Sequence, residues 1–496
     1  MTGLKVKITL TLILIVGMFL RLFELGSIPR GLHVDEVSLG NSADSILKTG
    51  TDISGKNQLP GYLYASIPFI ALFDLNSTSI RLVSAVSGVL SILGVYLLTS
   101  LLIDKSKPGY NAIPLIAATL LTITPWSIHL SRAAFEANFA FTLLIFAIYT
   151  FITFYNHKKL PIGVLSIILF SSTIFTYSPY RFITPVLIII LFSYYFNHFA
   201  KRHIVSLSLL FIMLSLPIMS NRLIGSDTNL VTQELNLGIS DESLGPILGF
   251  LQKFLIHFNA DYLFFKGDYS ARNSLKEFGL LLLPQLPFIA IGLYKSFVYN
   301  NKSKLVIYSL IILSPVSSAL STLTPHALKS YSLLLPLTIV SSIGLYHSTV
   351  FIKNIKLQRA IIGLIAILFS YSFISYTHIY YKHYPLKSSW DWNEESTIVA
   401  QHITSNYSNN QRVVIECDPG VLTKYLKFYS TNSNHTNDTI NYVLVKNLNE
   451  TQINNGDIVA IYGFRDPPPA LKNYNSLTMN NQAIAYKVGK WNQNEK

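Results

Sequence analysis

Long apolar runs, separated by short polar stretches, dominate the order of residues along this chain. Eleven of these runs approach or reach the length that a helix needs to cross a hydrocarbon core of roughly 30 Å. They lie at about residues 8–25, 82–103, 111–128, 134–155, 160–177, 182–199, 204–220, 278–294, 305–322, 331–350 and 360–377. The pattern predicts a polytopic α-helical membrane protein with about eleven transmembrane helices.

Two other apolar stretches do not fit as membrane spans. Residues 62–73, "YLYASIPFIALF", have the length of a helix that lies in the membrane interface. Residues 246–265 contain Lys253, His257 and Asp261, and we therefore interpret them as a re-entrant or interfacial segment.

The last part of the chain has a different composition, rich in Asn, Ser and Asp. Short runs of the kind found in buried strands occur in "RVVIECD" (412–418), "INYVLVKN" (440–447) and "GDIVAIYGF" (456–464), and "NEESTIVAQHITSN" before them is typical of a helix. The sequence predicts two domains, a transmembrane domain over residues 1–380 and a small α/β domain over residues 381–496.

The charge content supports the membrane assignment. Charged residues make up 13% of the chain and hydrophobic residues 50%, with a mean hydropathy of +0.40, whereas a soluble globular chain carries about 25% charged residues. The net charge of +13 is spread in small groups between the apolar runs, which argues against a nucleic-acid partner. The single cysteine, Cys417, excludes an intramolecular disulfide and a cysteine-based metal cluster.

Basic residues gather in alternate loops, which indicates the orientation in the cell membrane. These loops contain Lys5, Lys7, Lys105, Lys107, Lys158, Lys159, Lys201, Arg202, Lys295, Lys302, Lys304, Lys353, Lys356 and Arg359. Because cytoplasmic loops are enriched in Lys and Arg, we expect a cytoplasmic N-terminus and, after eleven crossings, an extracytoplasmic C-terminal domain.

The opposite set of loops contains the candidate functional residues. The loop "RGLHVDEVSLGNSADSILKTG" (30–50) brings His33, Asp35 and Glu36 together, and "HLSRAAFEANF" (129–139) places Arg132 and Glu136 four residues apart, as on one helical face. The later loops contribute Arg181, Arg272, His326 and Lys329. Each residue alone also has a structural explanation, such as a salt bridge at a helix end, an interfacial anchor, a helix cap or a solvated acid.

Taken together, these residues suit a lipid phosphate that bears a transferable group. Arg and Lys bind phosphate, and cations stabilise the charge that develops on a departing phosphate. A carboxylate can accept the proton of an attacking hydroxyl. The sequence has no P-loop and no G-x-G-x-x-G motif, which is consistent with a lipid donor rather than a nucleotide donor.

The chain resembles the GT-C glycosyltransferases, specifically the prokaryotic branch of the protein O-mannosyltransferase and aminoarabinose transferase group. The resemblance extends over most of residues 8–380 and rests on the Asp35-Glu36 pair, followed by "QLPGYLYASIPFIALF", "RLVSAVSGVLSILGVYLL", "LSRAAFEANF", "TYSPYRFITP", "YLFFKGDYSARNSLKEFGLLLLPQLPFIAIGL" and "TPHALKSYSLLLP". It implies inverting transfer of a sugar from a polyprenyl-phosphate-linked donor to an acceptor hydroxyl on the extracytoplasmic side. The acceptor is a protein, a lipid or a glycan of the cell envelope.

The same resemblance implies roles for particular residues. Asp35 is expected to be the general base, with Glu36 supporting it or contacting the acceptor. The substrate-binding candidates are His33, Arg132, Glu136, Arg181, Arg272, His326 and Lys329. Lys329 departs from the Arg expected at its position, and the chain lacks the lumenal repeats of the eukaryotic protein mannosyltransferases.

Two questions stay open at the level of sequence. No cofactor is implied with certainty, but some GT-C enzymes use a divalent metal ion, and Asp35, Glu36 and Glu136 are available as ligands. The alternatives to a glycosyltransferase are a transporter or flippase for lipid-linked saccharides and a non-catalytic membrane scaffold. A transporter is expected to carry charges at mid-membrane depth and broken helices in related halves, whereas the sequence shows no internal repeat and its predicted spans are almost free of charge. A scaffold gives no reason for acids and bases in every loop of one set.

Overall fold

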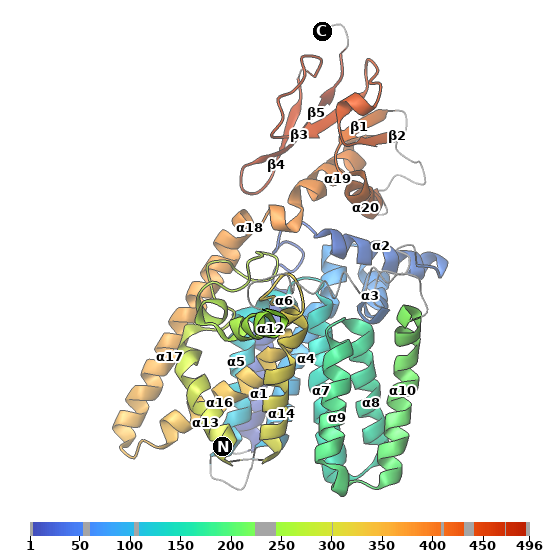
Figure 1. Ribbon diagram of the computed structural model, residues 1–496. Helices are drawn as coiled ribbons and strands as arrows, with labels where there is room; N and C mark the ends of the chain where they lie inside the picture. Colours follow the sequence, from blue (N-terminus) through green and yellow to red (C-terminus); the bar gives the residue numbers. More distant parts are fainter. Residues whose placement is uncertain are drawn as a thin grey trace. The chain divides into compact units, whose positions relative to one another are not determined.

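The fold is known from a computed structural model of the chain (Figure 1). It describes residues 3–52, 60–103, 109–223, 245–299, 301–407, 411–430, 441–471 and 473–492. Lys105 and Lys107, which contributed to the predicted orientation, lie outside the described residues.

Each of the eleven predicted runs overlaps a helix or two consecutive helices. They correspond to α1 (Gly3–Leu22), α4 (Ser77–Leu102), α5 (Ile113–Ile123) with α6 (Pro125–Ser131), α7 (Glu136–His157), α8 (Leu160–Thr176), α9 (Tyr180–Tyr194), α10 (Lys201–Leu223), α13 (Leu286–Tyr299), α14 (Asn301–Leu313) with α15 (Val316–Ala319), η7 (Tyr331–Leu333) with α16 (Leu334–Val350), and α17 (Ile355–His378). The prediction of a polytopic helical membrane protein is confirmed.

Not all of these helices have the full length of a membrane span. Within the described ranges, six apolar helices are long enough to cross a membrane, and the number is seven if a bent helix pair is counted as one span. Four more apolar helices are shorter, namely Pro60–Phe73, Leu160–Thr176, Tyr180–Tyr194 and Lys304–Ala319.

The bent pair is α5 and α6, which meet at an angle of 58°. Thr124 between them has an extended backbone, and Pro125 follows at the first position of α6. Proline has no amide hydrogen and disfavours a helical conformation of the residue before it, so the chain ends one helix and starts another at this point.

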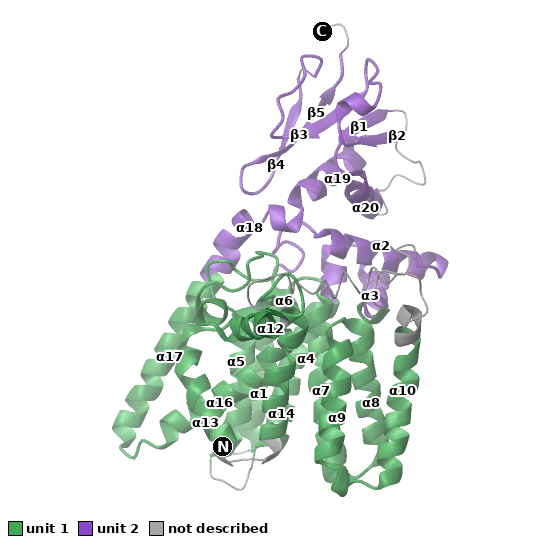
Figure 2. Ribbon diagram, viewed as in Figure 1, with its two compact units in different colours: residues 1–23, 59–62, 83–377 green, residues 24–58, 63–82, 378–496 purple. Residues whose placement is uncertain are grey.

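The described residues form two compact units that interleave along the chain (Figure 2). The first contains residues 1–23, 59–62 and 83–377, and the second contains residues 24–58, 63–82 and 378–496. The division into domains 1–380 and 381–496 therefore stays a prediction, since the second unit also takes in two early segments of the chain.

Helices α13 and α16 of the first unit approach each other closely at two glycines. A side chain at Gly292 would meet the backbone of Val340, and one at Gly344 would meet the backbone of Phe288. Close approach at small residues is the usual way in which membrane helices gain packing energy, because lipid provides no hydrophobic drive for helix association.

Buried polar side chains also join elements of the first unit that are distant in sequence. Arg21 donates to the Ser127 hydroxyl at 2.7 Å, while Asn138 donates to the Ser84 carbonyl and accepts from the Tyr331 hydroxyl. Such bonds are needed where polar groups are withdrawn from water.

The second unit contains a five-stranded sheet of order β2-β1-β3-β5-β4. Strands β1 (Arg412–Glu416), β2 (Asn441–Val445) and β3 (Ile458–Tyr462) are parallel, whereas β4 (Asn475–Thr478) and β5 (Ile484–Lys490) add an antiparallel edge. Its core includes Val414, Val459 and Ile461. Helices α19 (Glu394–Asn406) and α20 (Pro419–Ser430) complete the α/β fold, whose three predicted strands and first helix are confirmed.

Several segments differ from the sequence expectation. Residues 30–50, interpreted as a loop, are mostly helix α2 (Val34–Thr49). Helix α3 (Pro60–Phe73) covers the predicted interfacial segment, while 246–265 divides into α12 (Gly245–Leu255), the 3-10 turn η4 (Ile256–Phe258) and the π-helical turn η5 (Asp261–Phe265). The run at 278–294 becomes helical only after the 3-10 turn η6 (Leu283–Gln285), which contains a proline.

The remaining short helical elements of the described residues are η2 (Tyr110–Ala112), η3 (Phe196–His198), η8 (Ile379–His383), α18 (Tyr384–Lys387), η9 (Trp390–Trp392) and η10 (Leu448–Glu450).

Candidate functional site

The Asp35-Glu36 pair occupies the first turn of α2, in the second unit. His33 is the N-cap residue, and its Nδ1 accepts the backbone N–H of Asp35 at 3.2 Å. Glu36 closes a capping box by accepting the N–H of His33 with Oε2 at 3.2 Å. The helix dipole stabilises negative charge in this first turn, which is one reason why two acids stand here.

Glu36 is also one half of a buried ion pair with Arg81. Oε1 accepts from Arg81 Nε and Oε2 from Nη2, both at 2.9 Å, and the side chains are 3% and 0% exposed. The rest of the guanidinium donates to the carbonyls of Leu25, Pro29 and Gly31. All five N–H groups of Arg81 therefore have an acceptor, so the pair is satisfied in full.

Asp35 has the opposite environment. Its side chain is 66% exposed, and Oδ2 lies 3.2 Å from His33 Nδ1. The two adjacent carboxylates thus differ in burial and in their partners. Glu36 is fixed inside the structure, whereas Asp35 presents its carboxylate at the surface.

The C-terminal part of the second unit holds the start of α2. The N–H of Leu32 donates to Thr397 Oγ1, and that of Val34 donates to Asn393 Oδ1. The carbonyl of Leu32 accepts from the Tyr425 hydroxyl at 2.6 Å. Polar side chains of the α/β domain therefore satisfy backbone groups around the residues that precede Asp35.

Two other contacts extend this attachment. Asn41 of α2 donates to the carbonyl of Lys424 at 2.8 Å, and Arg81 lies over the ring of Trp392, 5.7 Å from its centroid. Gly31 has a φ of +75°, and a side chain there would meet the backbone carbonyl of Trp392. Residues near α2 thus pack closely against residues 392 and 424 of the C-terminal part of the chain.

A second group of predicted residues gathers in the first unit around Asp268. Its Oδ2 accepts the N–H of Ala327 at 2.6 Å, and its Oδ1 accepts the N–H of Ser270 at 2.9 Å. These bonds join the segment that contains Arg272 to the segment that contains His326 and Lys329. Burial raises the pKa of the Asp268 carboxyl, although the hydrogen bonds from Ala327 and Ser270 act in the opposite direction.

His326 is neutral in this cluster. Burial lowers its pKa to about 3, and the positive charges of Lys329 and Arg272 act in the same direction. Nδ1 accepts the N–H of Leu328 at 3.3 Å, which also requires an unprotonated Nδ1. The 3.8 Å approach of that atom to Asp268 Oδ2 is therefore not an ion pair at neutral pH. The cationic groups that act on His326 are Arg272 and Lys329.

Arg272 is held on two sides. Its backbone carbonyl lies 2.8 Å from His129 Nε2, and its guanidinium carbon lies 5.3 Å from the centroid of the Phe135 ring. A guanidinium stacked in this way keeps its planar fork oriented, which suits it to a phosphate group.

The remaining predicted residues belong to the first unit as well. Arg132 ends α6 and is fully buried, with Nη1 donating to the carbonyl of Leu20 at 2.9 Å. Glu136 begins α7, so the expectation that Arg132 and Glu136 share one helical face is wrong, because the chain turns between the two helices. Arg181 lies half-buried in the first turn of α9.

The described residues contain no group of three or more His, Cys, Asp or Glu side chains arranged to hold a metal ion. The sequence suggested Asp35, Glu36 and Glu136 as possible metal ligands. Asp35 and Glu36 belong to the second unit, and Glu136 belongs to the first.

Sequence reasoning did not identify Arg81 or Asp268. Arg81 stands near the start of an apolar helix, and Asp268 had been noted only as one charge in a polar loop. A charged residue close to a long apolar run was an available signal for Arg81. Its partner Glu36, 45 positions earlier, could not be deduced without the fold.

Comparison with known proteins gives one family match and several structural matches. Residues 57–220 match the family described as dolichyl-phosphate-mannose-protein mannosyltransferase. No sequence among the curated proteins matches this chain.

Several solved structures are similar to this chain in fold. ArnT from Cupriavidus metallidurans bound to undecaprenyl phosphate gives a TM-score of 0.60 at 10% identity, over 98% of both chains. The archaeal oligosaccharyltransferase AglB from Archaeoglobus fulgidus, in complex with an inhibitory peptide and a dolichol-phosphate, gives 0.52 at 13% identity. That match covers 86% of this chain but 63% of AglB, so this chain spans less than two thirds of the archaeal protein.

Proposed function

We propose that this chain is a membrane glycosyltransferase of the GT-C superfamily and that it transfers a sugar from a polyprenyl-phosphate-linked donor to an acceptor hydroxyl. The family match over residues 57–220 and the similarity of the fold to that of ArnT support this proposal. The reaction takes place on the extracytoplasmic side of the cell membrane, with inversion at the anomeric carbon. The N-terminus is cytoplasmic and the C-terminal α/β domain extracytoplasmic, as the distribution of basic residues indicates.

The observation that supports this function best is the contrast between Asp35 and Glu36. The Asp35 carboxylate is exposed at the start of α2, while its neighbour is fixed by Arg81. A general base must reach the proton that it abstracts. Asp35 has that access and Glu36 does not, so Asp35 is the catalytic residue and Glu36 is a positioning residue.

The transfer is a single displacement. Asp35 accepts the proton of the acceptor hydroxyl while the oxygen forms a bond to the anomeric carbon of the sugar. The bond between that carbon and the phosphate oxygen breaks, and the lipid phosphate leaves with the electron pair. The leaving group thus gains negative charge and needs neutralising cations rather than a proton.

Arg272 and Lys329 are the residues that we propose for the lipid phosphate. Both stand beside His326, and the Asp268 hydrogen bonds hold the two segments together. Arg can bind the phosphate with two parallel hydrogen bonds, and Lys adds a mobile positive charge. Arg181 is a further cation for the same group. The similar ArnT and AglB structures contain undecaprenyl phosphate and dolichol-phosphate, which supports a polyprenyl-phosphate donor here.

Asp35→Asn tests the function in membranes supplied with radiolabelled polyprenyl-phosphate sugars. Label should move to an acceptor in the wild type, and the variant should lose about 10²–10⁴-fold in rate, the usual contribution of a general base. Asp44→Asn is the matched control, since Asp44 belongs to the same helix and pairs with Lys48. Near-normal transfer by Asp35→Asn would overturn the role of Asp35.

The side of the reaction needs a separate experiment. Alkaline-phosphatase fusions after residues 50 and 400 should both be active if α2 and the α/β domain are extracytoplasmic. An inactive fusion at residue 50 would contradict the proposed orientation.

A further inference from the structure

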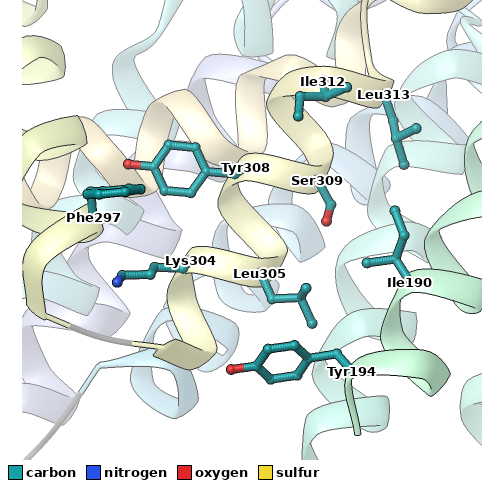
Figure 3. A pocket seen from close by; sticks show the side chains of 9 residues that line it. All are labelled: Ile190, Tyr194, Phe297, Lys304, Leu305, Tyr308, Ser309, Ile312 and Leu313. Carbon is teal, nitrogen blue, oxygen red and sulfur yellow. The ribbon is translucent and has the colours of Figure 1, made fainter. Parts of the chain in front are cut away.

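A cavity lies within the first unit between α9, α13 and α14 (Figure 3). Its volume is about 500 Å³, which falls in the usual range of ligand pockets, about 300–1,000 Å³. None of the predicted site residues lines it. Arg181 stands in the first turn of α9, whereas Ile190 and Tyr194 of the cavity come from the last turns of that helix.

The part of the lining that α14 supplies has its charged residue at one end and two aliphatic residues, Ile312 and Leu313, at the other, with Tyr308 and Ser309 between them. Lys304 belongs to the first turn of this helix and Leu313 is its last residue, so the cavity follows α14 for about 13 Å at the ordinary rise of a helix. Leu305 and Tyr194 lie at the same end of the cavity as Lys304, while Ile312 and Leu313 supply apolar surface at the other end.

The polar end has a positive charge that is held in place. Lys304 Nζ lies 4.9 Å from the centroid of the Phe297 ring. In the part of the chain that the structure describes, no carboxylate forms a salt bridge with Lys304.

A phospholipid has the same order of groups. Its phosphate lies at the membrane surface, near helix ends with Lys and Tyr, and its acyl chains extend into the hydrocarbon. We propose that this cavity binds one anionic glycerophospholipid of the surrounding membrane, with the phosphate at Lys304 and an acyl chain over Leu305 and Leu313.

This lipid is a separate ligand from the sugar donor. Its site is at the end of α9 opposite Arg181, in the leaflet that the basic loops predict to be cytoplasmic. The proposal does not depend on the proposed function, because lipid retention is measured without any transfer reaction.

Native mass spectrometry of the full-length protein in detergent can test the proposal. The protein is titrated with phosphatidylglycerol or with phosphatidylcholine of identical acyl chains. The wild type should retain one phosphatidylglycerol in preference to phosphatidylcholine. A single Lys near an anionic membrane surface contributes roughly fivefold in affinity, so Lys304→Gln should lose about that much of the preference.

Two variants sharpen the result. Lys159→Gln removes the same charge from an exposed loop residue outside the cavity and should keep the preference. Leu305→Trp fills part of the cavity and should reduce retention of both lipids. Equal retention of the two lipids by the wild type, equal effects of Lys304→Gln and Lys159→Gln, or retention of undecaprenyl phosphate in place of phosphatidylglycerol would each overturn the proposal.

Discussion

Arg81 contacts both carboxylate oxygens of Glu36 at 2.9 Å in the interior of the second unit, while the preceding residue, Asp35, is 66% exposed. Glu36 therefore has a structural role in a buried ion pair, whereas Asp35 is accessible to a substrate. Substitutions of the two acids should consequently have different effects.

Glu36→Ala should destabilise the protein strongly and Asp35→Ala should not. Removing one partner of a buried ion pair costs about 3–5 kcal/mol, because the other charge stays buried without compensation. Thermal unfolding of the purified protein in detergent measures the difference. Arg81→Lys should also destabilise, since Lys keeps the charge but not the fork that reaches five acceptors. Similar melting temperatures for Glu36→Ala and Asp35→Ala would contradict this assignment.

His33 was predicted to bind substrate, but its place at the N-cap of α2 suggests a structural role. His33→Ala should cost about 1 kcal/mol through loss of the cap, and His33→Asn should restore most of it, since Asn is among the best N-cap residues. Transfer activity separates the two roles. If His33→Asn is as stable as the wild type but inactive, His33 acts on the substrate rather than through the helix.

The Tyr425 hydroxyl should be needed to position Asp35, although it belongs to the α/β domain. Tyr425→Phe leaves the buried carbonyl of Leu32 without its 2.6 Å donor, a loss of about 1–3 kcal/mol. We expect a lower kcat with little change in KM for the lipid donor. Thr423→Val, at an exposed position of the same helix, is the control. An unchanged kcat in Tyr425→Phe would show that the α/β domain does not orient α2.

Stability should fall below neutral pH because of His326. Its pKa is about 3 in the folded protein against 6.5 for an ordinary His, so the unfolded chain binds a proton that the folded protein does not. The contribution is complete above pH 6.5 and is lost as the pH falls toward 3, with about 2 kcal/mol lost at pH 5.

Asp268 acts in the opposite direction, because its folded pKa is raised. The measurement is therefore the change in melting temperature from pH 7 to pH 5 in the wild type and in His326→Gln. The variant should lose less stability over that interval. A steeper decline in the variant would mean that His326 is charged in the folded protein.

Two of the three arginines predicted for substrate binding, Arg272 and Arg132, should behave differently. Arg272→Gln should raise KM for the lipid donor, with partial recovery in Arg272→Lys, because the positive charge binds phosphate even without the fork. Arg132→Gln should instead lower stability by about 1–3 kcal/mol, since Arg132 is buried and donates to the Leu20 carbonyl. A higher KM in Arg132→Gln without loss of stability would place Arg132 in the substrate site.

Local sequence was sufficient for much of the fold. A helix satisfies its own backbone groups, so an apolar run such as 134–155 already specifies α7 (Glu136–His157). The buried strands at 412–418 and 456–464 were also recognisable from local sequence, since a short apolar run between polar segments is typical of a buried strand. The antiparallel strands β4 and β5 and helix α20 were missed, because their apolar content is lower and their identity depends on what they pack against.

The sequence by itself determined a multi-pass helical membrane protein with a C-terminal α/β domain, and it pointed to Asp35 and Glu36 as the acids of interest. Only the tertiary structure decided which acid is exposed, because burial of Glu36 depends on Arg81 and on the carbonyls of Leu25, Pro29 and Gly31. It also decided that Asp268 holds Arg272 and Lys329 in one cluster. Hydrophobic periodicity is a property of residues close together in the chain, so it predicts individual helices and strands. Ion pairs and hydrogen bonds between distant residues form only when folding brings their atoms within about 3 Å.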